Sequence, residues 1–522
     1  YMAGIELRRS KVTDLMTRGF GYDPNSLTTK PLVFPEGSTQ MDNAEFEQYS
    51  KSFTEDRFLS VYMTGSYTYN NRYTFFGSLR YDGSNMFGVD RKYKYLPLWA
   101  VSGAWNINRE AFLSDADWLS DLKLRASYGV QGNVDKDTSP LVVGEWDNTQ
   151  VLPDNSESNI IVSSPPNQYL RWEKTTNWNG GLDVVVLGNR IAFTADVYRR
   201  VSDDLIGMRS LPGENGFDYS TMNWAKLTNR GYELSLSTVN VKTKDFRWVM
   251  DFNLAHNKSK INRLNVRDNS YEPSREGYSV GAVFSLKTAG LDENGLQMFY
   301  NKQGEKVSFN DFFGLEYGYM MGGLIPFLKS NLSAEEYRNL FTYEGTTEPK
   351  FTGGWINRFY YKNFDLTVSA SFVLDQTVQE QPFYNPVQTS PGQNYSRRMS
   401  QIWSPDNTSG KYPRIMGTYT EGEENWAYQW LGMLDPGNSY RKYDYWFKKM
   451  SYMRINSIRL GYTFPERLLG HIGFSSARIS FEARNPFVFG SSYKGYFDPE
   501  TYGNIYTQPL AKTFSCGIDL TF

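Results

Sequence analysis

Long runs in which apolar and polar residues alternate strictly are the feature that most constrains this fold. From Phe364 to Leu374 every second residue is apolar, and similar runs cover 122–130, 191–197 and 514–522. Successive side chains of a strand point to opposite faces, so each run predicts a strand with one apolar and one polar face. The runs approach the roughly 9–11 residues that a tilted strand needs to cross the hydrocarbon of a membrane.

The same pattern, bounded by turn residues, predicts fourteen strands along the chain. They are expected near 1–9, 57–69, 72–82, 96–107, 121–131, 170–186, 191–206, 227–239, 245–257, 350–360, 364–374, 448–464, 475–487 and 510–522.

The connections between these strands are alternately short and long. Short ones include Asn70-Asn71 and Leu187–Arg190, whereas the long ones occupy more than half of the chain. Long loops are expected near 10–56, 132–169, 207–226, 258–349, 375–447 and 488–509, with a shorter one at 83–95. Compact soluble domains seldom contain a structureless loop above about 12–15 residues. Tight turns at one end and long loops at the other are typical of outer-membrane barrels, so residues 1–522 are predicted to form one all-β, transmembrane antiparallel barrel region rather than a soluble sandwich.

Composition excludes several other classes of protein. No stretch of the 522 residues approaches the 18 or more consecutive apolar residues of a membrane-spanning helix. A net charge of −2 gives no basic surface for nucleic acid. The single cysteine, Cys516, excludes a disulfide scaffold, and two histidines make a histidine-based active site improbable. We therefore predict a protein that is not an enzyme.

Eight segments together carry a family resemblance. They are Leu79–Gly88, Leu119–Asn133, Arg171–Asp183, Gly188–Tyr198, Asn223–Leu234, Glu348–Gly354, Ser451–Pro465 and Leu520–Phe522. In order and spacing they resemble the SusC-like (SusC/RagA-type) branch of the TonB-dependent outer-membrane transporters of Bacteroidetes-type bacteria. The resemblance runs from about residue 57 to the C-terminus and implies the C-terminal portion of a roughly 22-stranded barrel. The family's plug domain and TonB box do not match any part of this sequence.

The resemblance implies TonB-dependent import of an oligomeric nutrient, a glycan or a peptide, across the outer membrane of a Gram-negative bacterium. Its implied partners are a SusD-like surface lipoprotein that acts as a lid, TonB acting through a missing N-terminal part, the N-terminal plug and barrel part of the same transporter, and the lipid bilayer. The alternative is a SusC-like barrel that serves as a structural or assembly subunit without import. A surface enzyme or adhesin built on a barrel is a weaker third hypothesis.

Candidate binding residues lie in the long loops, where aromatic, amide and acidic side chains are frequent. Segments such as 298–300, 426–430 and 440–446 are expected to contact substrate or a protein partner, but the sequence assigns no individual substrate-binding residue. Aromatic residues near strand ends are expected to form the girdles found at the two membrane interfaces. These residues are Trp172, Trp178, Trp248, Tyr462 and Phe464.

The sequence predicts no catalytic residue, metal site or cofactor. His256, at the outer end of a strand, and His471, in a short turn, each lack a second ligand nearby. Cys516 shares the apolar parity of the last strand and is expected to behave as a small hydrophobic residue. Acidic loop segments could hold a calcium ion, although solvated loop is the favoured interpretation. These segments are 291–295, 420–425 and 498–500.

Overall fold

The computed structural model describes most of the chain, and it separates into two compact units. The described residues are 1–34, 48–86, 94–136, 138–152, 155–320, 325–390, 392–417, 422–469, 473–490, 498–501 and 508–522. Unit 1 comprises Tyr1–Tyr67, Phe76–Val101 and Gly129–Lys174, and unit 2 comprises Thr68–Phe75, Ser102–Tyr128 and Thr175–Phe522.

Fourteen strands form one large sheet, and every pairing that can be traced residue by residue is antiparallel. In sheet order they are β1 (Met2–Thr17), β4 (Tyr49–Tyr69), β5 (Tyr73–Ser84), β6 (Tyr95–Asn106), β7 (Leu119–Asn133), β10 (Glu173–Val186), β11 (Ile191–Ser210), β12 (Tyr219–Lys242), β13 (Phe246–Arg263), β21 (Phe351–Tyr361), β22 (Phe364–Gln379), β23 (Phe447–Thr463), β24 (Ser476–Phe489) and β25 (Thr513–Thr521). Each corresponds to one predicted strand, so the predicted all-β antiparallel fold is confirmed. Among the described helices, none has the length and apolar character needed to span a membrane.

Several strands extend well past their predicted ends. The strand expected at 227–239 is β12, which begins at Tyr219, and β1 continues to Thr17 into the loop expected at 10–56. The apolar alternation stops where the hydrocarbon would end, but backbone pairing has no such limit and continues into the aqueous region. The long connections are also less irregular than expected. The one near 132–169 contains the hairpin of β8 (Val143–Leu152) and β9 (Asn155–Ser164).

The register gives the sheet of unit 2 two chemically different faces. On the apolar face Phe252 pairs with Leu236 on one side and with Trp355 on the other. One residue away on the same strand, Asp251 lies on the polar face and pairs with Ser237. Directly paired residues share a face, and the alternation therefore persists from strand to strand.

The connections at Asn70-Asn71 and Leu187–Arg190 are tight turns, as predicted. Gly188 and Asn189 have φ values of +60° and +66°, the left-handed conformation expected for this hairpin. The connection between β23 and β24 contains the short helix α5 (Glu466–Leu469), which begins directly after Pro465.

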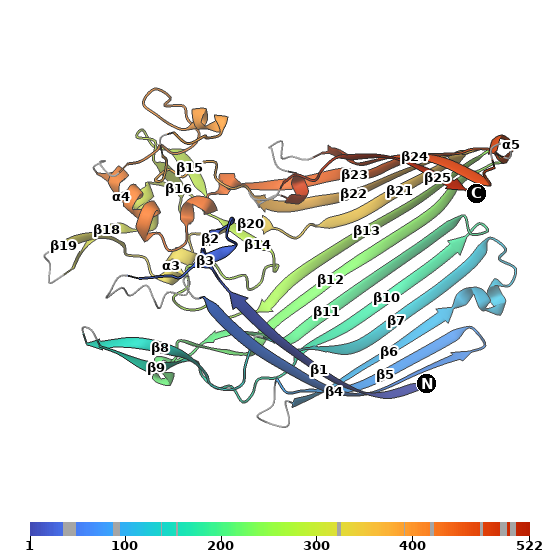
Figure 1. Ribbon diagram of the computed structural model, residues 1–522, viewed down its shortest axis with the longest axis horizontal. Coiled ribbons are helices and arrows are strands. Elements are labelled where there is room, and N and C mark those ends of the chain that lie inside the picture. The colour runs from blue at the N-terminus through green and yellow to red at the C-terminus, as the bar shows by residue number, and fades with distance from the viewer. Residues whose placement is uncertain are drawn as a thin grey trace. The chain divides into compact units, whose positions relative to one another are not determined.

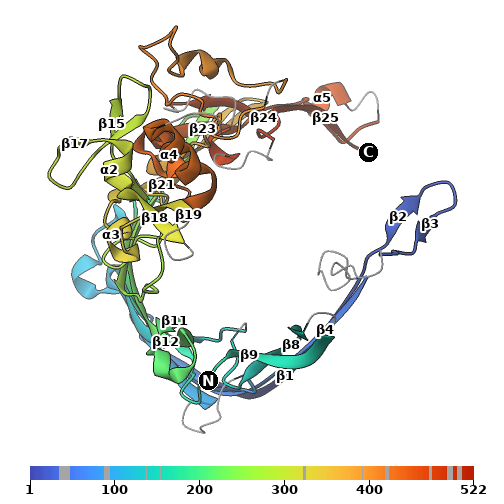
Figure 2. The same ribbon diagram turned by 90° about the vertical axis from the view of Figure 1, so that its left-hand side faces the viewer.

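At the other end of the strands of unit 2, the two longest connections fold together (Figures 1 and 2). We call the described residues of 264–350 and 380–446 the loop assembly. Figure 1 shows α4, β15 and β16 at the end of β21–β23 that lies opposite α5. The elements of the loop assembly are β14 (Ala282–Ser285), β15 (Thr288–Leu291), β16 (Gln297–Tyr300), β17 (Lys306–Val307), α2 (Phe309–Phe313), β18 (Leu315–Met320), β19 (Ile325–Ser330), α3 (Ala334–Arg338), β20 (Thr342–Thr346) and α4 (Glu423–Gln429).

Unit 1 is held by strand pairing and by ion pairs between strands. Sixteen residues of β1 pair with β4, from Met2 opposite Thr64 to Thr17 opposite Tyr49. Arg80 Nη2 lies 2.8 Å from Glu6 Oε2. A small hairpin of β2 (Phe20–Asp23) and β3 (Thr28–Lys30) occupies part of the connection between β1 and β4.

Candidate ligand-binding region

Arg125 is the centre of an ion-pair cluster on the polar face of unit 2. Its Nε lies 2.7 Å from Asp183 Oδ2, and its Nη1 lies 3.1 Å from Asp196 Oδ1. A planar guanidinium with five N–H donors can hold two carboxylates at once. Gly181 leaves room for this arrangement, because a Cβ there would come within 2.6 Å of the guanidinium. The Gly-Gly-Leu-Asp sequence at 180–183 therefore has a structural role.

Two further ion pairs continue this pattern across the polar face. Arg358 contacts Asp251, and Arg478 Nη1 lies 2.7 Å from Asp365 Oδ1. Each pair joins neighbouring or nearby strands and cancels its own charge. The polar face is therefore lined by paired charges and hydroxyl groups, which suits the water-filled interior of a barrel.

The loop assembly contains a conventional hydrophobic core made largely of aromatic residues. Its buried members are Leu286, Leu296, Phe299, Phe309, Phe312, Phe313, Leu315, Leu328, Tyr337, Tyr384, Ile402, Met416, Ala427, Trp430, Tyr440, Tyr443 and Trp446. Phe299 and Phe312 stack at a centroid distance of 4.2 Å, and Trp446 stacks on Tyr412 at 5.5 Å. Because both long connections supply these residues, neither would bury its aromatic side chains without the other.

This core accounts for only part of the aromatic loop segments. Segments 298–300, 426–430 and 440–446 are expected from sequence to contact substrate or a protein partner. Phe299, Trp430 and Trp446 are buried instead, whereas Tyr300 is 41% exposed and Lys442 lines a cavity. The apolar surface of the three buried residues contributes more to stability inside a core than on a water-exposed loop. The sequence pattern could not distinguish these two uses, because the partner of each segment lies in the other connection.

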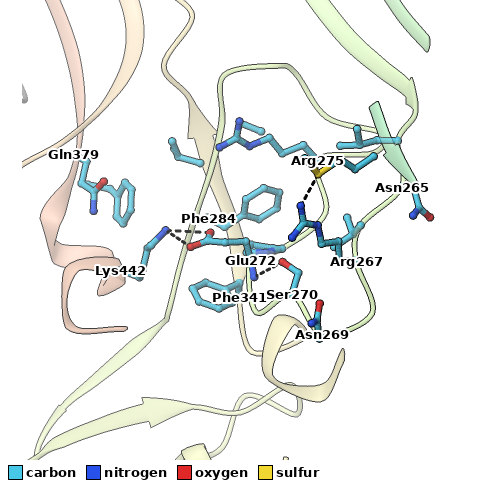
Figure 3. A pocket seen from close by; sticks show the side chains of 17 residues that line it. Asn265, Arg267, Asn269, Ser270, Glu272, Arg275, Phe284, Phe341, Gln379 and Lys442 are labelled. Atoms are coloured by element: carbon cyan, nitrogen blue, oxygen red, sulfur yellow. Dashed lines mark hydrogen bonds and ion pairs between the residues drawn. The ribbon is translucent and has the colours of Figure 1, made fainter. Parts of the chain in front are cut away.

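A cavity of about 860 Å³ adjoins the loop assembly (Figure 3). We call it the loop cavity. Most of its lining comes from residues 264–284, together with Met208, Phe341, Gln379, Lys442 and Phe447. The cavity offers amide groups, charged groups and the rings of Phe284 and Phe341 to a ligand.

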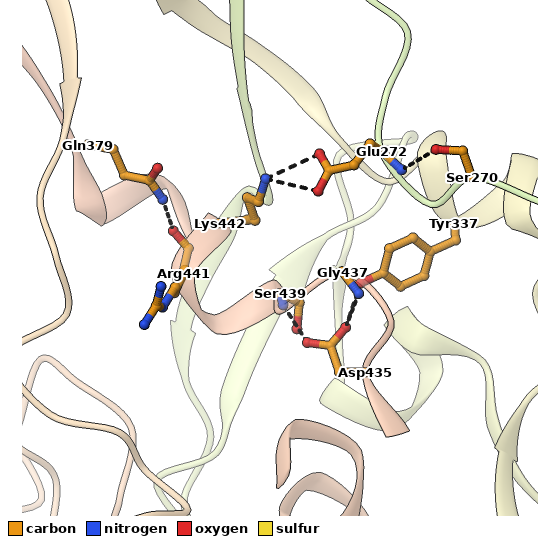
Figure 4. Close-up of polar contacts among 9 residues, drawn as sticks. All are labelled: Ser270, Glu272, Tyr337, Gln379, Asp435, Gly437, Ser439, Arg441 and Lys442. Carbon is orange, nitrogen blue, oxygen red and sulfur yellow. Dashed lines mark hydrogen bonds and ion pairs between the residues drawn. The ribbon is translucent and has the colours of Figure 1, made fainter. Parts of the chain in front are cut away.

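The charged groups of the loop cavity are held in place by short polar contacts (Figure 4). Lys442 Nζ lies 3.3 and 3.2 Å from the two carboxylate oxygens of Glu272, and the backbone N–H of Glu272 donates to Ser270 Oγ at 3.2 Å. Arg267 places its guanidinium 3.9 Å from the centroid of the Tyr219 ring.

Asp435 fixes the turn that leads to Lys442. It accepts hydrogen bonds from the Tyr337 hydroxyl at 2.8 Å, from the N–H of Gly437 at 3.1 Å and from the N–H of Ser439. Burial, together with the nearby Asp435 carboxylate, raises the pKa of Tyr337, so this hydroxyl remains a donor. The arrangement can bind a polar ligand through fixed hydrogen-bond donors and acceptors beside apolar rings.

The two histidines and the cysteine have no shared site among the described residues. His256 Nδ1 lies 2.6 Å from the carbonyl oxygen of Lys350, and its ring lies beside those of Tyr232 and Phe351. His471 lies outside the described residues. Cys516 is exposed on the apolar face opposite Phe481, as its parity predicts.

Three of the five aromatic residues predicted for the girdles lie on strands, and Trp172 and Phe464 directly adjoin strand ends. Trp248 donates from Nε1 to Asn357 Oδ1 at 2.8 Å, and Tyr462 packs on Phe364 at a ring distance of 4.6 Å and on Phe464 at 5.1 Å. Trp178 is 49% exposed, whereas Trp172 is only 7% exposed and donates to the carbonyl oxygen of Lys94. Trp172 therefore packs within unit 1, contrary to the girdle prediction.

Carboxylates of the acidic loop segments form ion pairs and hydrogen bonds with other residues of the protein. Arg454 Nε lies 2.6 Å from Glu500 Oε1, and the same guanidinium contacts Asp498. Asp292 Oδ1 accepts from the N–H of Leu296 at 2.7 Å, and Glu424 lies 3.1 Å from Arg414. In the part of the chain that is described, no three His, Cys, Asp or Glu side chains converge as metal ligands would. Calcium binding by these loops stays an untested prediction.

An antiparallel sheet with an exposed apolar face and an ion-paired polar face defines the class of outer-membrane β-barrel proteins. The family model described as TonB dependent receptor-like, beta-barrel matches residues 4–312, which is more than half of the chain. The chain belongs to this family, and the outer membrane of a Bacteroidetes-type bacterium is its location, as predicted.

Similar proteins narrow the assignment to the SusC-like branch. TonB-dependent receptor P3 of Formosa agariphila is 28% identical over 507 residues, covering 91% of this chain and 46% of that protein. TonB-dependent receptor SusC of Bacteroides thetaiotaomicron is 28% identical over 495 residues, covering 92% and 45%. The solved structure of the RagAB peptide transporter superposes with a TM-score of 0.73 at 22% identity, covering 100% of this chain and 53% of that one. The chain thus spans about half the length of the relatives it matches.

Proposed function

We propose that this chain is part of a transporter that imports an oligomeric nutrient, a glycan or a peptide, across the outer membrane in a TonB-dependent manner. The observation that carries the proposal is the family match over residues 4–312. The ion-paired polar face supports it, because a hydrated wall lets a polar ligand pass without being stripped of water.

The loop cavity is the proposed contact site for the nutrient in this chain. Its amide groups can bond to the hydroxyl or peptide groups of an oligomer, and its phenylalanine rings can cover an apolar patch. In this proposal, import consists of ligand binding and conformational gating. The transported ligand is not chemically changed, and no cofactor is required.

The proposed partners are a SusD-like surface lipoprotein, which would cover the loops as a lid, and TonB, which would act through residues outside this chain. Two solved structures of the RagAB peptide importer are described as closed-closed and open-open states, which supports a lid that opens and closes. The buried core of the loop assembly would support the surface that such a lid contacts.

Uptake by a strain that lacks the gene tests this function. We expect the deletion strain to lose uptake of one class of oligomer within a panel of oligosaccharides and peptides, and the native protein to co-purify with a surface lipoprotein. Normal uptake of every oligomer, with a stable outer-membrane complex still present, would contradict import and favour the structural role.

The loop cavity is tested separately in the complemented strain. Lys442→Met should weaken uptake because it removes a cation from the cavity and leaves Glu272 without this ion pair. The matched control is Lys329→Met, which removes a lysine paired with Glu316 that does not line this cavity. Equal uptake by the two variants would remove the cavity from the proposal.

A further inference from the structure

Three basic residues on adjacent strands form a row on the apolar face of unit 2. Arg199 of β11 lies directly opposite Arg230 of β12, which lies directly opposite Lys258 of β13. Two residues nearer the short turns, the corresponding row is Val197, Tyr232 and His256. The basic row is thus one step beyond the last aromatic row of the apolar face, towards the long connections.

A groove of about 880 Å³ surrounds this row, and we call it the rim groove. Lys260, the next residue of β13 on the same face, also lines it, as do Tyr278 and Tyr343. These two tyrosine rings stack at a centroid distance of 4.8 Å and are 40% and 42% exposed. The groove therefore combines basic groups with a flat aromatic wall.

The four basic residues that β11, β12 and β13 contribute to the rim groove are not neutralised by ion pairs among the described residues. Arg199, Arg230, Lys258 and Lys260 form no ion pair within 4 Å with any carboxylate that the structure describes. Three acidic residues also line the groove. Glu344 lies 2.6 Å from Lys287, and Glu348 accepts from Ser259 Oγ at 2.6 Å. The third is Asp375, whose backbone N–H donates to Ser451 Oγ at 3.0 Å. Like charges directly opposite each other destabilise a sheet, so the row favours an anion from outside the protein.

The position of the groove along the strands indicates which kind of anion would bind there. The apolar rows below it face lipid chains, and the long connections of outer-membrane barrels are on the cell's exterior. A group just above the apolar rows meets the headgroups of the outer leaflet, where phosphates are the main anions. Basic groups close to a membrane surface attract anionic lipid headgroups.

We propose that the rim groove binds the phosphate of a phosphorylated glycolipid of the outer leaflet, with its acyl chains lying along the apolar rows. Arg230 and Lys258 hold the phosphate, and the Tyr278–Tyr343 wall contacts the sugar ring that carries it. The basic row lies on the opposite face of the sheet from the Arg125 ion-pair cluster, so lipid binding by this row does not depend on the proposed import.

The test measures lipid binding to the purified native complex by native mass spectrometry. The probes are lipid A, enzymatically dephosphorylated lipid A and inorganic phosphate. The variant Arg230→Gln/Lys258→Gln removes two cations, and its matched control is Lys242→Gln/Arg247→Gln, a directly opposed basic pair on the same two strands near their short turn. At about tenfold per 1.4 kcal/mol and about 1 kcal/mol per cation, the first variant should bind lipid A roughly thirtyfold more weakly.

We expect wild type and the control to bind lipid A equally and to prefer it to the dephosphorylated form. Arg230→Lys, which retains the charge, should keep most of the affinity and so separates binding from misfolding. Equal binding of both lipids, or an unchanged affinity in Arg230→Gln/Lys258→Gln, would overturn the proposal. Displacement of lipid A by inorganic phosphate at similar concentration would overturn the lipid assignment in favour of a free-anion site.

Discussion

The loop assembly and the large sheet of unit 2 use aromatic and aliphatic residues in opposite ways. In the loop assembly Phe299, Tyr443 and Trp446 are completely buried. On the apolar face of the sheet, by contrast, Leu460, Phe481 and Ile518 are 45%, 46% and 68% exposed. Exposure on this scale along a regular face is costly in water and favourable in lipid.

This difference in exposure indicates that the loop assembly is stabilised in water and the sheet in lipid. The loop assembly folds as a small water-soluble domain would, by burying apolar area within itself. The sheet leaves its apolar area for the membrane and holds its polar face together with ion pairs such as Arg125 with Asp183. Substitutions in the loop core and on the two faces of the sheet should therefore differ in their effects on stability.

Removing a tryptophan should affect the two regions differently. Trp446→Ala empties part of the loop core and should lower the free energy of unfolding of the loop assembly by about 3–5 kcal/mol. Trp178→Ala, on the exposed apolar face, should change it little. Limited proteolysis of the loops under increasing urea measures both. Equal protease sensitivity of the two variants would show that the loop core and the apolar face respond alike to the loss of a tryptophan.

A charge introduced on the apolar face should be far more harmful than one on the polar face. Phe481→Arg places a guanidinium in lipid and should cost up to about 2–4 kcal/mol if it lies near the bilayer midplane. Ser480→Arg, one residue away on the polar face, should be close to neutral. Urea-dependent folding into lipid vesicles, followed by electrophoretic mobility, measures the difference, and similar costs for both variants would contradict the assignment of faces.

Alkaline pH should destabilise the loop assembly before the sheet. Burial raises the pKa of Tyr337, Tyr440, Tyr443 and Tyr445 above the value of about 10 in an unfolded chain. Their contribution to stability is fully present below about pH 10 and is lost as the pH rises towards the folded-state pKa. Protease protection of the loops should therefore fall above pH 10 while the strand signal in circular dichroism persists. Simultaneous loss of both signals would count against separate modes of stabilisation.

Breaking one ion pair of the polar face should have the smallest effect. Asp365→Asn leaves Arg478 without its partner at 2.7 Å, yet both groups are partly exposed to water. Partly exposed pairs contribute about 1 kcal/mol or less, so the urea midpoint of sheet unfolding should shift only slightly. A loss of unfolding free energy as large as that caused by Phe481→Arg would mean that water does not reach the polar face.

The sequence predicts the sheet well because its signal is local. Each strand carries its own alternation, so the order and parity of all fourteen strands are predictable without any long-range contact. The strand ends are less predictable, as Tyr219 of β12 shows, because pairing continues where the apolar alternation has stopped.

The loop assembly and its cavity are much harder to predict, because they depend on distant contacts. Lys442 and Glu272 lie 170 residues apart, and no local pattern brings them together. One local signal was available: Ser333 and Glu336 have the spacing of a capping box, and they begin α3 with both of its hydrogen bonds. The rim groove could also have been suspected, since Arg199, Arg230 and Lys258 follow the apolar parity of their strands.

The reactivity of the native cysteine shows whether the two faces of the sheet contact lipid and water, respectively. Cys516 lies on the apolar face, and Ser515 lies beside it on the polar face. In intact outer membranes a charged, membrane-impermeant maleimide should leave Cys516 unmodified until denaturant is added. The same reagent, added to opened membrane vesicles, should modify the variant Cys516→Ser/Ser515→Cys readily. Rapid labelling of Cys516 with protection of residue 515 would mean that the polar face, not the apolar face, is shielded from water. The protein would then not be a membrane barrel.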